Sequence, residues 1–243
     1  MERYFTGAED VSTPNAQSLS SVYTSAGQFQ QTLGNNASRA EKTGSLLRPE
    51  LELSYRKFIN IFSPFMLNAE PDEISRKKRR YRFDKNDQCV VYFLQEGDYF
   101  LSTQNGHKII DILSSPSIAG VVPGLSKMPL YLERVDYGKI SYLPHDDFWR
   151  LVFEFDLFDD AMLIMSAQQS ELINYIALNK ANALEEVRSL IGWWSKIPDH
   201  LKRRFSIMYL IENSSWLSKS SISRALKAMK EKGEIALERG RIS

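Results

Sequence analysis

The sequence predicts an α+β fold: a small antiparallel β-barrel, then a long helix, then a C-terminal winged helix-turn-helix. Between residues 81 and 143, short apolar runs alternate with turn signals, which is typical of an antiparallel barrel or sandwich. A stripe of apolar residues at helical spacing follows. From residue 201 onward, the pattern indicates a helix, a tight turn, a second helix and the start of a β-hairpin, with Trp216 and Leu217 expected as plugs between the two helices. Four segments are therefore expected, at residues 1–48, 49–150, 151–182 and 183–243.

Composition limits the class of protein. The chain has 243 residues, of which 43% are hydrophobic and 12% aromatic, enough for one or two domains with a packed core. Its one cysteine, Cys89, cannot form an internal disulfide or a four-cysteine metal site, which fits a reducing compartment. No apolar run approaches the roughly 18 residues of a membrane span, and no apolar segment follows Met1 as in a secretory signal. We expect a cytoplasmic protein that does not enter the membrane.

Residues 1–48 are predicted to be a polar tail that is disordered or loosely attached. Ser, Thr, Asn, Gln and Gly supply about half of this segment, which leaves too little apolar surface to offset the entropy of ordering. Alternatively, the segment docks as a folded arm through Val22, Phe29 and Leu33. From Pro49 onward, apolar residues at helical spacing predict a helix.

The barrel segment contains several predicted strands and turns. Asn105-Gly106 is a strong signal for a two-residue hairpin turn, and residues 136–138 are predicted to form a second turn. Pro144 is expected to end the barrel. The predicted strands cover residues 89–94, 99–101, 107–113, 130–135 and 139–143.

The densest run of charge extends from Ser75 to Arg80. One interpretation is a nucleic-acid contact or a localisation signal. The alternative is a solvated connector or an edge strand, in which charges block pairing with other chains. Tyr81 and Phe83 alternate with Arg80 and Arg82, and this alternation favours a strand.

A long helix after the barrel has a stripe of apolar residues spaced by four and three. Such a stripe is typical of a coiled-coil-like seam, so we expect residues 156–180 to form a homodimer contact. The alternative is that the stripe packs on the barrel of its own chain. The stripe consists of Phe158, Met162, Met165, Gln169, Leu172 and Ile176.

Another amphipathic helix is predicted near the C-terminus. Ser218 is a suitable N-cap, because its hydroxyl can accept a hydrogen bond from the first turn. Gly233 lies where a left-handed residue would end the helix. One face is apolar, with Ile222, Ala225, Leu226 and Met229 at the spacing of a helix. The opposite face has Ser220, Ser223, Arg224 and Lys227.

The polar face and its flanks are the predicted DNA-binding site. From residue 202 to 243 there are ten Lys or Arg and four Glu, although the whole chain has 31 basic and 30 acidic residues. Such a local excess of positive charge is expected of a DNA-binding domain. The alternative is an ordinary pair of helices whose basic face is exposed to solvent and binds no partner. The candidates for base contact are Ser220, Ser223 and Arg224. The candidates for phosphate contact are Lys219, Ser221, Lys227, Arg239 and Arg241, and the N-cap Ser218 is also counted among the DNA-binding residues.

This order of elements resembles the superfamily of the cyclic AMP receptor protein and the regulator FNR. The stretch VYFLQEG, from Val91 to Gly97, is similar to a strand ending of that family, and LSKSSISRAL, from Leu217 to Leu226, is similar to its recognition helix. Residues 185–243 and 115–121 more closely resemble the enterobacterial IprA-type branch. The resemblance implies a cyclic-nucleotide-binding-like barrel of the cupin-type jelly-roll class, a homodimer, and regulation of transcription through double-stranded DNA.

Departures from the family concern its effectors. A cyclic nucleotide pocket needs a Gly-Glu pair and a downstream Arg to hold ribose and phosphate, but no Glu follows Gly120 and no Arg precedes Leu130. Lys127 is the nearest cation, so we predict that the barrel does not bind cyclic AMP. Iron–sulfur sensing needs several cysteines. Cys89 leads an apolar strand and is predicted to be a buried packing thiol, whereas a redox sensor would need exposure.

No catalytic residue, metal site or cofactor is predicted, so we do not expect an enzyme. A metal-dependent cupin would need clustered histidines and carboxylates, but His107, His145 and His200 lie in separate segments without ligand spacing. A second function stays open: the helix-turn-helix could bind protein instead of DNA, next to a barrel that senses a ligand or a redox change. Either function leaves room for a small-molecule effector of unknown identity.

Overall fold

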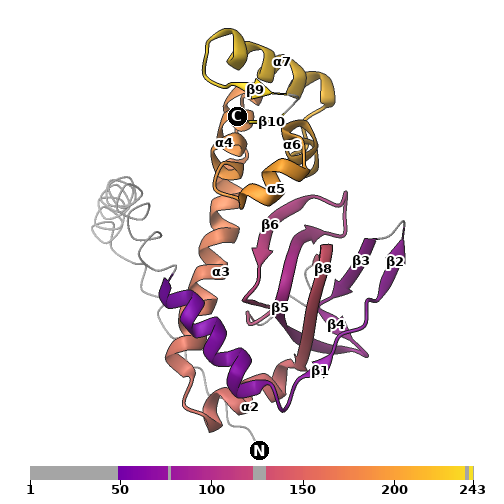
Figure 1. Ribbon diagram of the computed structural model, residues 1–243, viewed down its shortest axis with the longest axis vertical. Coiled ribbons are helices and arrows are strands. Elements are labelled where there is room, and N and C mark those ends of the chain that lie inside the picture. Colours follow the sequence, from indigo (N-terminus) through magenta and orange to yellow (C-terminus); the bar gives the residue numbers. More distant parts are fainter. Residues whose placement is uncertain (1–48, 76–77, 123–129, 239–240, 243) are drawn as a thin grey trace, which may run out of the picture. The chain divides into compact units, whose positions relative to one another are not determined.

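The computed structural model describes residues 49–75, 78–122, 130–238 and 241–242, and the described residues from Glu50 onward belong to one compact unit (Figure 1). The predicted polar tail, residues 1–48, lies outside the described part. Residues 49–62 form the predicted helix, which ends just before Ser63 and Pro64. The strands that follow are β1 (Leu67–Asn68), β2 (Glu73–Ser75), β3 (Lys78–Arg82), β4 (Asp84–Lys85), β5 (Gln88–Thr103), β6 (Ile109–Ser114), β7 (Ser117–Ala119) and β8 (Leu130–Pro144).

The second half of the chain is mainly helical. Its helices are α2 (His145–Glu154), α3 (Phe158–Leu178), α4 (Ala183–Trp194), α5 (Asp199–Arg204), α6 (Ile207–Ser214) and α7 (Lys219–Glu231). A short hairpin of β9 (Leu237–Glu238) and β10 (Arg241–Ile242) ends the described part. We call α4 to α7 with this hairpin the C-terminal module. No helix among the described residues is long and apolar enough to cross a membrane.

The sheet is organised around the antiparallel pair of β5 and β8. Eight strands of the described chain form one curled sheet in the order β2-β3-β8-β5-β4, with β6 and β7 also paired to β5 and β1 paired to β8. The β5–β8 ladder runs from Val90↔Pro144 to Thr103↔Leu130. The sheet is therefore a half-barrel with β5 and β8 at its centre, as the fold class predicted.

Two predicted strand interruptions are absent. We expected turns after residue 94 and at residues 136–138, but both β5 and β8 continue through these positions. Gly97 pairs with Gly138, and the register shifts on either side of Gly97. A side chain at Gly97, where φ is +89°, would collide with the Tyr137 carbonyl. Two facing glycines thus let the long pair bend where the sequence suggested turns.

The predicted hairpin after β5 exists, but its loop is longer than expected. Thr103 and Lys108 close it, because the Thr103 amide donates to the Lys108 carbonyl at 2.9 Å and the Lys108 amide donates to Thr103 Oγ1 at 3.1 Å. Residues 104–107 form the loop. Its left-handed residues are Gly106 (φ +74°) and His107 (φ +51°). In the predicted two-residue turn, the left-handed residues would have been Asn105 and Gly106.

Part of the basic run lies in a strand, as its alternation predicted. Lys78–Arg82 is β3, which pairs with β8 and with the outer strand β2, while residues 76 and 77 lie outside the described part. Lys78 and Arg80 both form ion pairs with Glu133, at 2.7 and 3.0 Å. Glu133 is buried, so these two cations compensate a carboxylate inside the protein instead of forming a free basic surface.

Cys89 corrects another expectation, because its side chain is exposed and not a buried packing thiol. It pairs with Asp84 of the two-residue strand β4, and the buried run of β5 begins one residue later, at Val90. An apolar run in sequence thus marks the strand but not the residue at which burial starts.

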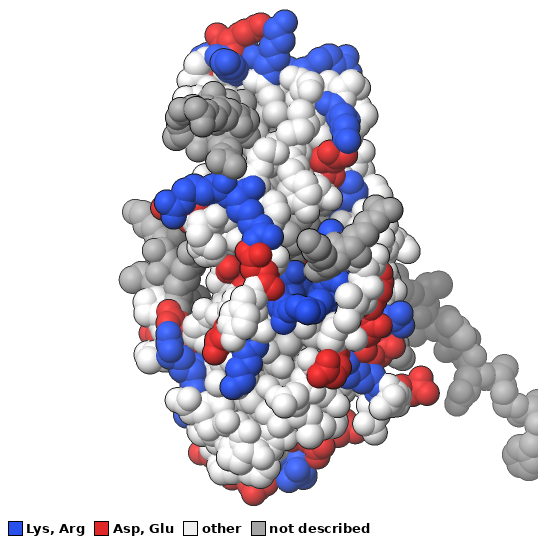
Figure 2. Space-filling model, turned by 45° about the vertical axis from the view of Figure 1, so that its right-hand side comes forward, with Lys and Arg blue, Asp and Glu red and all other residues white. Residues whose placement is uncertain are grey.

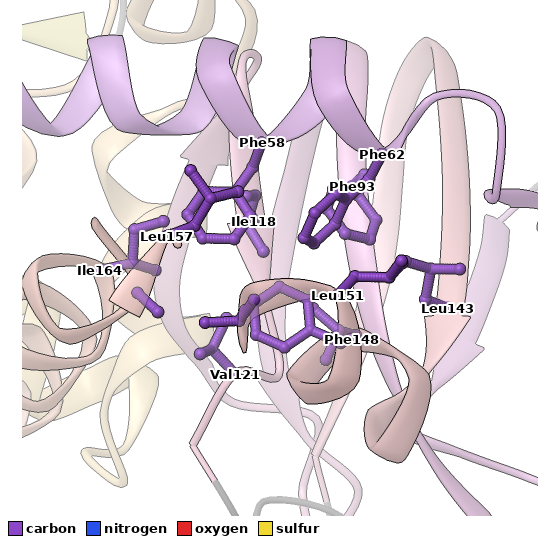
Figure 3. Packing of buried hydrophobic residues seen from close by; sticks show 13 residues of the cluster. Phe58, Phe62, Phe93, Ile118, Val121, Leu143, Phe148, Leu151, Leu157 and Ile164 are labelled. Atoms are coloured by element: carbon purple, nitrogen blue, oxygen red, sulfur yellow. The ribbon is translucent and has the colours of Figure 1, made fainter. Parts of the chain in front are cut away.

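Aromatic rings join the helix of residues 49–62 to the sheet and to α2 (Figure 3). Phe58 stacks on Phe148 of α2, with ring centroids 5.5 Å apart, and Phe62 meets Phe93 of β5 edge-on at 6.1 Å. Leu157 and Ile164 bring the start of α3 into the same cluster. This core fixes α3 against the side of the half-barrel.

The predicted long helix is present as α3, which contains all six residues of the stripe, but only part of the stripe is exposed. α2 and α3 are separate helices, with left-handed Asp156 between them. Met165 and Leu172 pack on the chain's own core clusters, as the alternative to a dimer seam required. The exposed apolar residues of α3 are Phe158, Met162, Ile173 and Ile176. The exposed apolar stripe of α3 therefore includes Ile173, which was not among the residues predicted from the spacing of four and three.

The C-terminal module also differs from its prediction in two details. The helix expected around residues 201–211 is two helices, because Phe205 is extended and the Ser206 side chain accepts from the Tyr209 amide to begin α6. Trp216, expected as a plug between helices, is 67% exposed. Its ring lies against the hairpin loop of the barrel, where Lys108 Nζ is 5.1 Å from the ring centroid.

One carboxylate joins the first helix to α3 and gives the fold a testable pH dependence. Asp160 accepts from Ser54 Oγ and pairs with Lys57 Nζ, both at 2.6 Å. Burial alone would raise the pKa of Asp160, but the hydrogen bonds from Lys57 and Ser54 outweigh burial and leave that pKa below its usual value. An acid with a lowered pKa stabilises the fold above its unfolded pKa, and this contribution is lost as pH falls through the folded pKa.

We expect Asp160→Asn to lower the free energy of unfolding by about 1–2 kcal/mol at neutral pH, because a charge-assisted pair becomes a neutral one. The loss relative to wild type should shrink as pH falls through the lowered pKa of Asp160. Urea unfolding at a series of pH values measures it, with the exposed Asp147→Asn on α2 as control. A difference that stays constant with pH would contradict this role.

Candidate nucleic-acid interface

The buried face of α7 packs on the other helices of the C-terminal module. Ile222, Ala225, Leu226 and Met229 are buried, as predicted. Their cluster also contains buried residues of α4 and α6, namely Val187, Leu190, Ile191, Trp194, Ile207, Leu210 and Ile211. Burial of four side chains at helical spacing fixes the rotation of α7, so the opposite face must point outward.

Both ends of α7 are capped as the sequence predicted. Ser218 Oγ accepts from the Ser221 amide at 3.2 Å. At the other end, Gly233 is left-handed with φ +71°. Its amide donates to the Lys230 carbonyl, and the Glu234 amide donates to the Met229 carbonyl. These two bonds are the Schellman arrangement, which ends the helix at a defined residue.

The outward face carries the predicted base contacts. Ser220, Ser223, Arg224 and Lys227 are all exposed. Among the described residues, Arg224 makes two long hydrogen bonds within the helix, from Nε to the Ser220 carbonyl at 3.4 Å and from Nη2 to Ser221 Oγ at 3.5 Å. The guanidinium is therefore held near the start of α7 by weak bonds and can exchange them for stronger ones to an acceptor.

The first turn of α7 contains no acidic residue. The helices α2, α3, α4 and α5 each have an acidic residue in the first turn, which compensates the positive end of the helix dipole, whereas α7 has none. Instead, the hydroxyls of Ser220 and Ser221 lie 2.9 and 3.0 Å from Ser218 Oγ. Hydroxyl groups and a positive dipole end together favour a phosphate group.

The predicted phosphate-binding lysines are exposed and only weakly paired. Lys219 Nζ lies 3.1 Å from Glu212, and Lys227 Nζ lies 3.8 Å from Glu231. Exposed pairs contribute little to stability, so phosphates can replace these carboxylates at small cost. Glu212 on α6 was not expected near the site. No sequence pattern indicated its position, because the pair crosses from one helix to the next.

The remaining predicted residues are only partly described. Arg239 lies outside the described residues, and Arg241 is placed in the backbone of β10, which pairs with β9. The structure brings the other seven together along one face and one end of α7. In Figure 2, Lys and Arg side chains gather at the upper end of the molecule, where Figure 1 places α7.

A small hollow lies between the half-barrel and α3. Its volume is about 30 Å³, and its wall is mainly apolar. The described wall residues include two carboxylates, Asp111 and Glu171, and no Lys or Arg. Burial raises the pKa of the neighbouring Tyr55 to about 12, against the lowering effect of its hydrogen bond to Ser117. The wall consists of Phe83, Leu101, Ile110, Asp111, Leu113, Ile118, Ala119, Gly120, Gln168, Glu171 and Leu172.

The three histidines lie apart and have different neighbours. His107 contacts the Tyr131 hydroxyl, His145 contacts Trp149 Nε1, and His200 Nε2 lies 2.7 Å from Asp98. In the described part of the chain, no group of three His, Cys, Asp or Glu side chains could hold a metal ion.

Comparison with known proteins agrees with the sequence resemblance. No protein-family model matches the chain. Over 185 residues it is 23% identical to the protein named inhibitor of hydrogen peroxide resistance in Escherichia coli K12, covering 70% of this chain and 87% of that relative. The protein of the same name in Escherichia coli O157:H7 matches equally well.

Solved structures show the same fold. A variant of CooA from Carboxydothermus hydrogenoformans superposes with a TM-score of 0.50 and 15% identity, covering 68% of this chain and 81% of that one. The c-di-GMP responsive global regulator CLP of Xanthomonas campestris gives a TM-score of 0.48 at 15% identity, covering 68% and 91%. The curled antiparallel half-barrel with its helices is thus a fold that this chain shares with CooA.

Proposed function

We propose that the chain is a sequence-specific, DNA-binding regulator of transcription, in which α6 and α7 form a helix-turn-helix and β9–β10 form a short wing. The observation that carries the proposal is α7 itself. It is capped at both ends, its apolar face is buried, and its Ser, Arg and Lys side chains are exposed. An α-helix with such a face fits the major groove, with its N-terminal residues at the base edges.

Each predicted residue has a role in this proposal. Arg224 reads a base edge, with Ser220 and Ser223 beside it, because a guanidinium can donate two bonds to guanine. Ser218, Lys219, Ser221 and Lys227 hold the phosphate backbone, together with Arg239 and Arg241 of the wing. The uncompensated N-terminal end of α7 supports phosphate contact at Ser218 to Ser221.

We further propose a homodimer through α3. Ile173 and Ile176 are 65% and 66% exposed, and Phe158 and Met162 extend the same apolar stripe toward the start of the helix. Apolar residues on an exposed helix seam favour pairing with a second copy. A two-fold dimer would present two copies of α7 about 34 Å apart and bind a two-fold DNA site.

The barrel of this regulator is proposed not to bind cyclic AMP. Specific small-molecule pockets have volumes of roughly 300–1,000 Å³, which is far larger than the hollow. A cyclic phosphate also needs a cation, whereas the described wall presents two carboxylates. Lys127, the cation considered from the sequence, lies outside the described residues.

The first prediction tests the DNA contact. Arg224→Ala should weaken binding to a preferred site by ~1–3 kcal/mol and relax the preference at one base pair, because a base contact is lost. The preferred site comes from selection of random duplexes with the full chain, and gel shift gives the affinities. Arg150→Ala, which removes an exposed arginine from α2, is the matched control. Equal weakening on all sequences would make Arg224 a phosphate contact instead.

A salt series separates DNA binding from the protein-binding alternative. Phosphate contacts release counterions, so the affinity for DNA must fall steeply as salt rises. If the chain binds no duplex even at low salt, the proposal fails and a helix-turn-helix that binds protein becomes the better account.

The dimer is tested by charge in the α3 stripe. The double variant Ile173→Asp, Ile176→Asp should raise the dimer dissociation constant by roughly 100-fold or more, because each buried apolar residue is lost twice across a two-fold contact. Sedimentation velocity measures the change. Leu53→Asp is the control, since Leu53 is equally exposed, at 67%, on another helix. A wild-type chain that stays monomeric at a protein concentration of tens of micromolar would exclude the dimer, because even a weak dimer should form at about that concentration.

Calorimetric titration of the full chain with cyclic AMP tests the third proposal. We expect no binding heat up to about 1 mM nucleotide, where only weak association would be detected. A dissociation constant in the micromolar range or tighter would show that the hollow opens into a nucleotide pocket.

A further inference from the structure

Exposed phenylalanines gather in one region of the molecule. Among the described residues, the phenylalanines with substantial exposure are Phe65, Phe153, Phe155 and Phe158, with exposed fractions from 39% to 68%. Phe65 follows the helix of residues 49–62, Phe153 and Phe155 lie at the end of α2, and Phe158 begins α3. Ring contacts join Phe65 to Phe155 and Phe153 to Phe158, each pair with centroids 6.1 Å apart. Single exposed apolar residues are ordinary, whereas four exposed rings in one region favour a surface that a partner covers.

Carboxylates alternate with these rings along the chain. Residues 153–159 read FEFDLFD, and Leu157 is the one buried residue of the seven. From residue 145 to 160 there are six acidic residues and one arginine, Arg150. Figure 2 shows Asp and Glu side chains along the lower end of the molecule, where Figure 1 places α2. We call the following exposed residues the aromatic-acidic patch: Phe65, Phe153, Glu154, Phe155, Asp156, Phe158 and Asp159.

The negative charge of the patch is largely uncompensated. No ion pair among the described residues of α2 and α3 includes Asp156 or Asp159. Glu154 pairs with Arg150 at 3.3 Å, but both side chains are more than half exposed, so the pair contributes little. Asp159 lies in the first turn of α3, where the helix dipole favours an acid. The dipole does not account for Asp156, and the carboxylates remain available to a cationic partner.

The backbone holds the patch in one conformation. The Leu157 amide donates to the Val152 carbonyl at 2.9 Å, and the Asp156 amide donates to the Phe153 carbonyl at 3.4 Å. These bonds end α2 in a Schellman arrangement, in which Asp156 is left-handed with φ +52°. Glycine is the usual residue at that position, so this chain keeps a carboxylate where a residue without a side chain would be less strained. Leu157 anchors the turn in the core, and a rigid surface loses less entropy on binding.

The chemistry of the patch limits what can bind it. Carboxylates repel phosphate groups, which disfavours nucleic acid and anionic membranes. Exposed rings with carboxylates between them favour a cation that also has a flat, weakly hydrated surface. The guanidinium of arginine has both properties, because it stacks on aromatic faces and donates two parallel hydrogen bonds to a carboxylate. Aliphatic side chains next to the arginine would cover the remaining ring surface.

We propose that the aromatic-acidic patch is a docking site for a second protein, which contributes a segment with arginine and aliphatic side chains. Phe153 and Phe155 lie outside the α3 stripe, and the patch meets that stripe only at Phe158. The site is therefore different from the proposed homodimer contact. It is also independent of DNA binding by α7, so either proposal can fail without the other.

Peptide selection on the full chain tests the site. Short random peptides displayed on phage are selected on wild type and depleted on Phe153→Ser, which changes a ring that is 68% exposed. We expect the retained peptides to combine arginine with aliphatic residues. Retained peptides without arginine, or no peptide that distinguishes the two proteins, would overturn the proposal.

A synthetic copy of a retained peptide then tests a ring that the selection did not use. Phe158→Ser should weaken its binding by about fivefold or more, the effect expected of an interface residue that costs over 1 kcal/mol when truncated. Fluorescence anisotropy measures the affinity. Leu53→Ser, at an apolar residue that is 67% exposed on another helix, should bind as wild type does. Equal losses in Phe158→Ser and Leu53→Ser would contradict a localised site.

The carboxylates are tested by the triple variant Glu154→Gln, Asp156→Asn, Asp159→Asn. Asparagine tolerates the left-handed conformation, so the turn after α2 is kept. The peptide should bind this variant at least about fivefold more weakly at low salt, and the affinity should change less with salt, because charge pairs are lost. Lysine in place of the peptide's arginine should weaken binding to wild type, since an ammonium cannot stack and pair bidentately.

A matched control removes three exposed carboxylates elsewhere: Asp84→Asn, Asp87→Asn, Asp199→Asn. Asp87 is left-handed, as Asp156 is, and Asp199 lies in the first turn of a helix, as Asp159 does. The control should bind the peptide as wild type does. If it loses as much affinity as the patch variant, the peptide is attracted by the overall charge of the chain and the docking site is rejected.

Two other occupants of the patch come from the chain itself. If a second copy covers the patch, Phe153→Ser should raise the dimer dissociation constant in sedimentation velocity; we expect no change. If residues 1–48 cover it, Phe29→Ser with Leu33→Ser should strengthen peptide binding; we again expect no change. Either effect would replace the second protein as the occupant and overturn the proposal.

Discussion

The pairing of β5 with β8 is the constraint on which the rest of the structure depends. The two strands are 16 and 15 residues long, and their shared ladder gives the sheet three surfaces for packing. Phe93 and Leu143 pack on the helix of residues 49–62 and on α2. Tyr92 and Leu132 lie in the core of the half-barrel, and Phe100 packs on the C-terminal module. Long strands that twist can present different neighbours along their length, which short strands cannot do. The facing glycines Gly97 and Gly138 permit the bend this requires.

The elements that the sequence predicted well are those defined by local chemistry. In α7, a Ser cap, a Gly terminator and four apolar residues at helical spacing all lie within sixteen residues, and each acts on its near neighbours. The same local origin explains why the polar face of α7 was predicted residue by residue. Arg239 and Arg241 stay predictions, since neither side chain belongs to the described part of the chain.

The errors concern contacts between distant segments. Residues 136–138 resemble a turn, but pairing with β5 keeps them in a strand. Cys89 begins an apolar run, yet its position opposite Asp84 leaves it exposed. Trp216 is apolar and lies between two helices, yet the barrel loop receives it. In the α3 stripe, the half-barrel covers Leu172 and leaves Ile173 to solvent. Periodicity in the sequence identifies the apolar face of a helix or strand. Which residues of that face become buried depends on the segments that pack against it in the folded protein.

The position of Phe100 and Ile109 has a consequence for how such chains can be recombined. These barrel residues complete the hydrophobic core of the C-terminal module. The segment boundary predicted at residue 183 therefore separates two parts of the sequence that share one core. A module transplanted onto a foreign barrel would expose the apolar surface that the hairpin now covers. The unit that changes together is therefore the module with β5 and β6, so substitutions in α6 and α7 and in the β5–β6 hairpin are expected to accumulate together in related sequences.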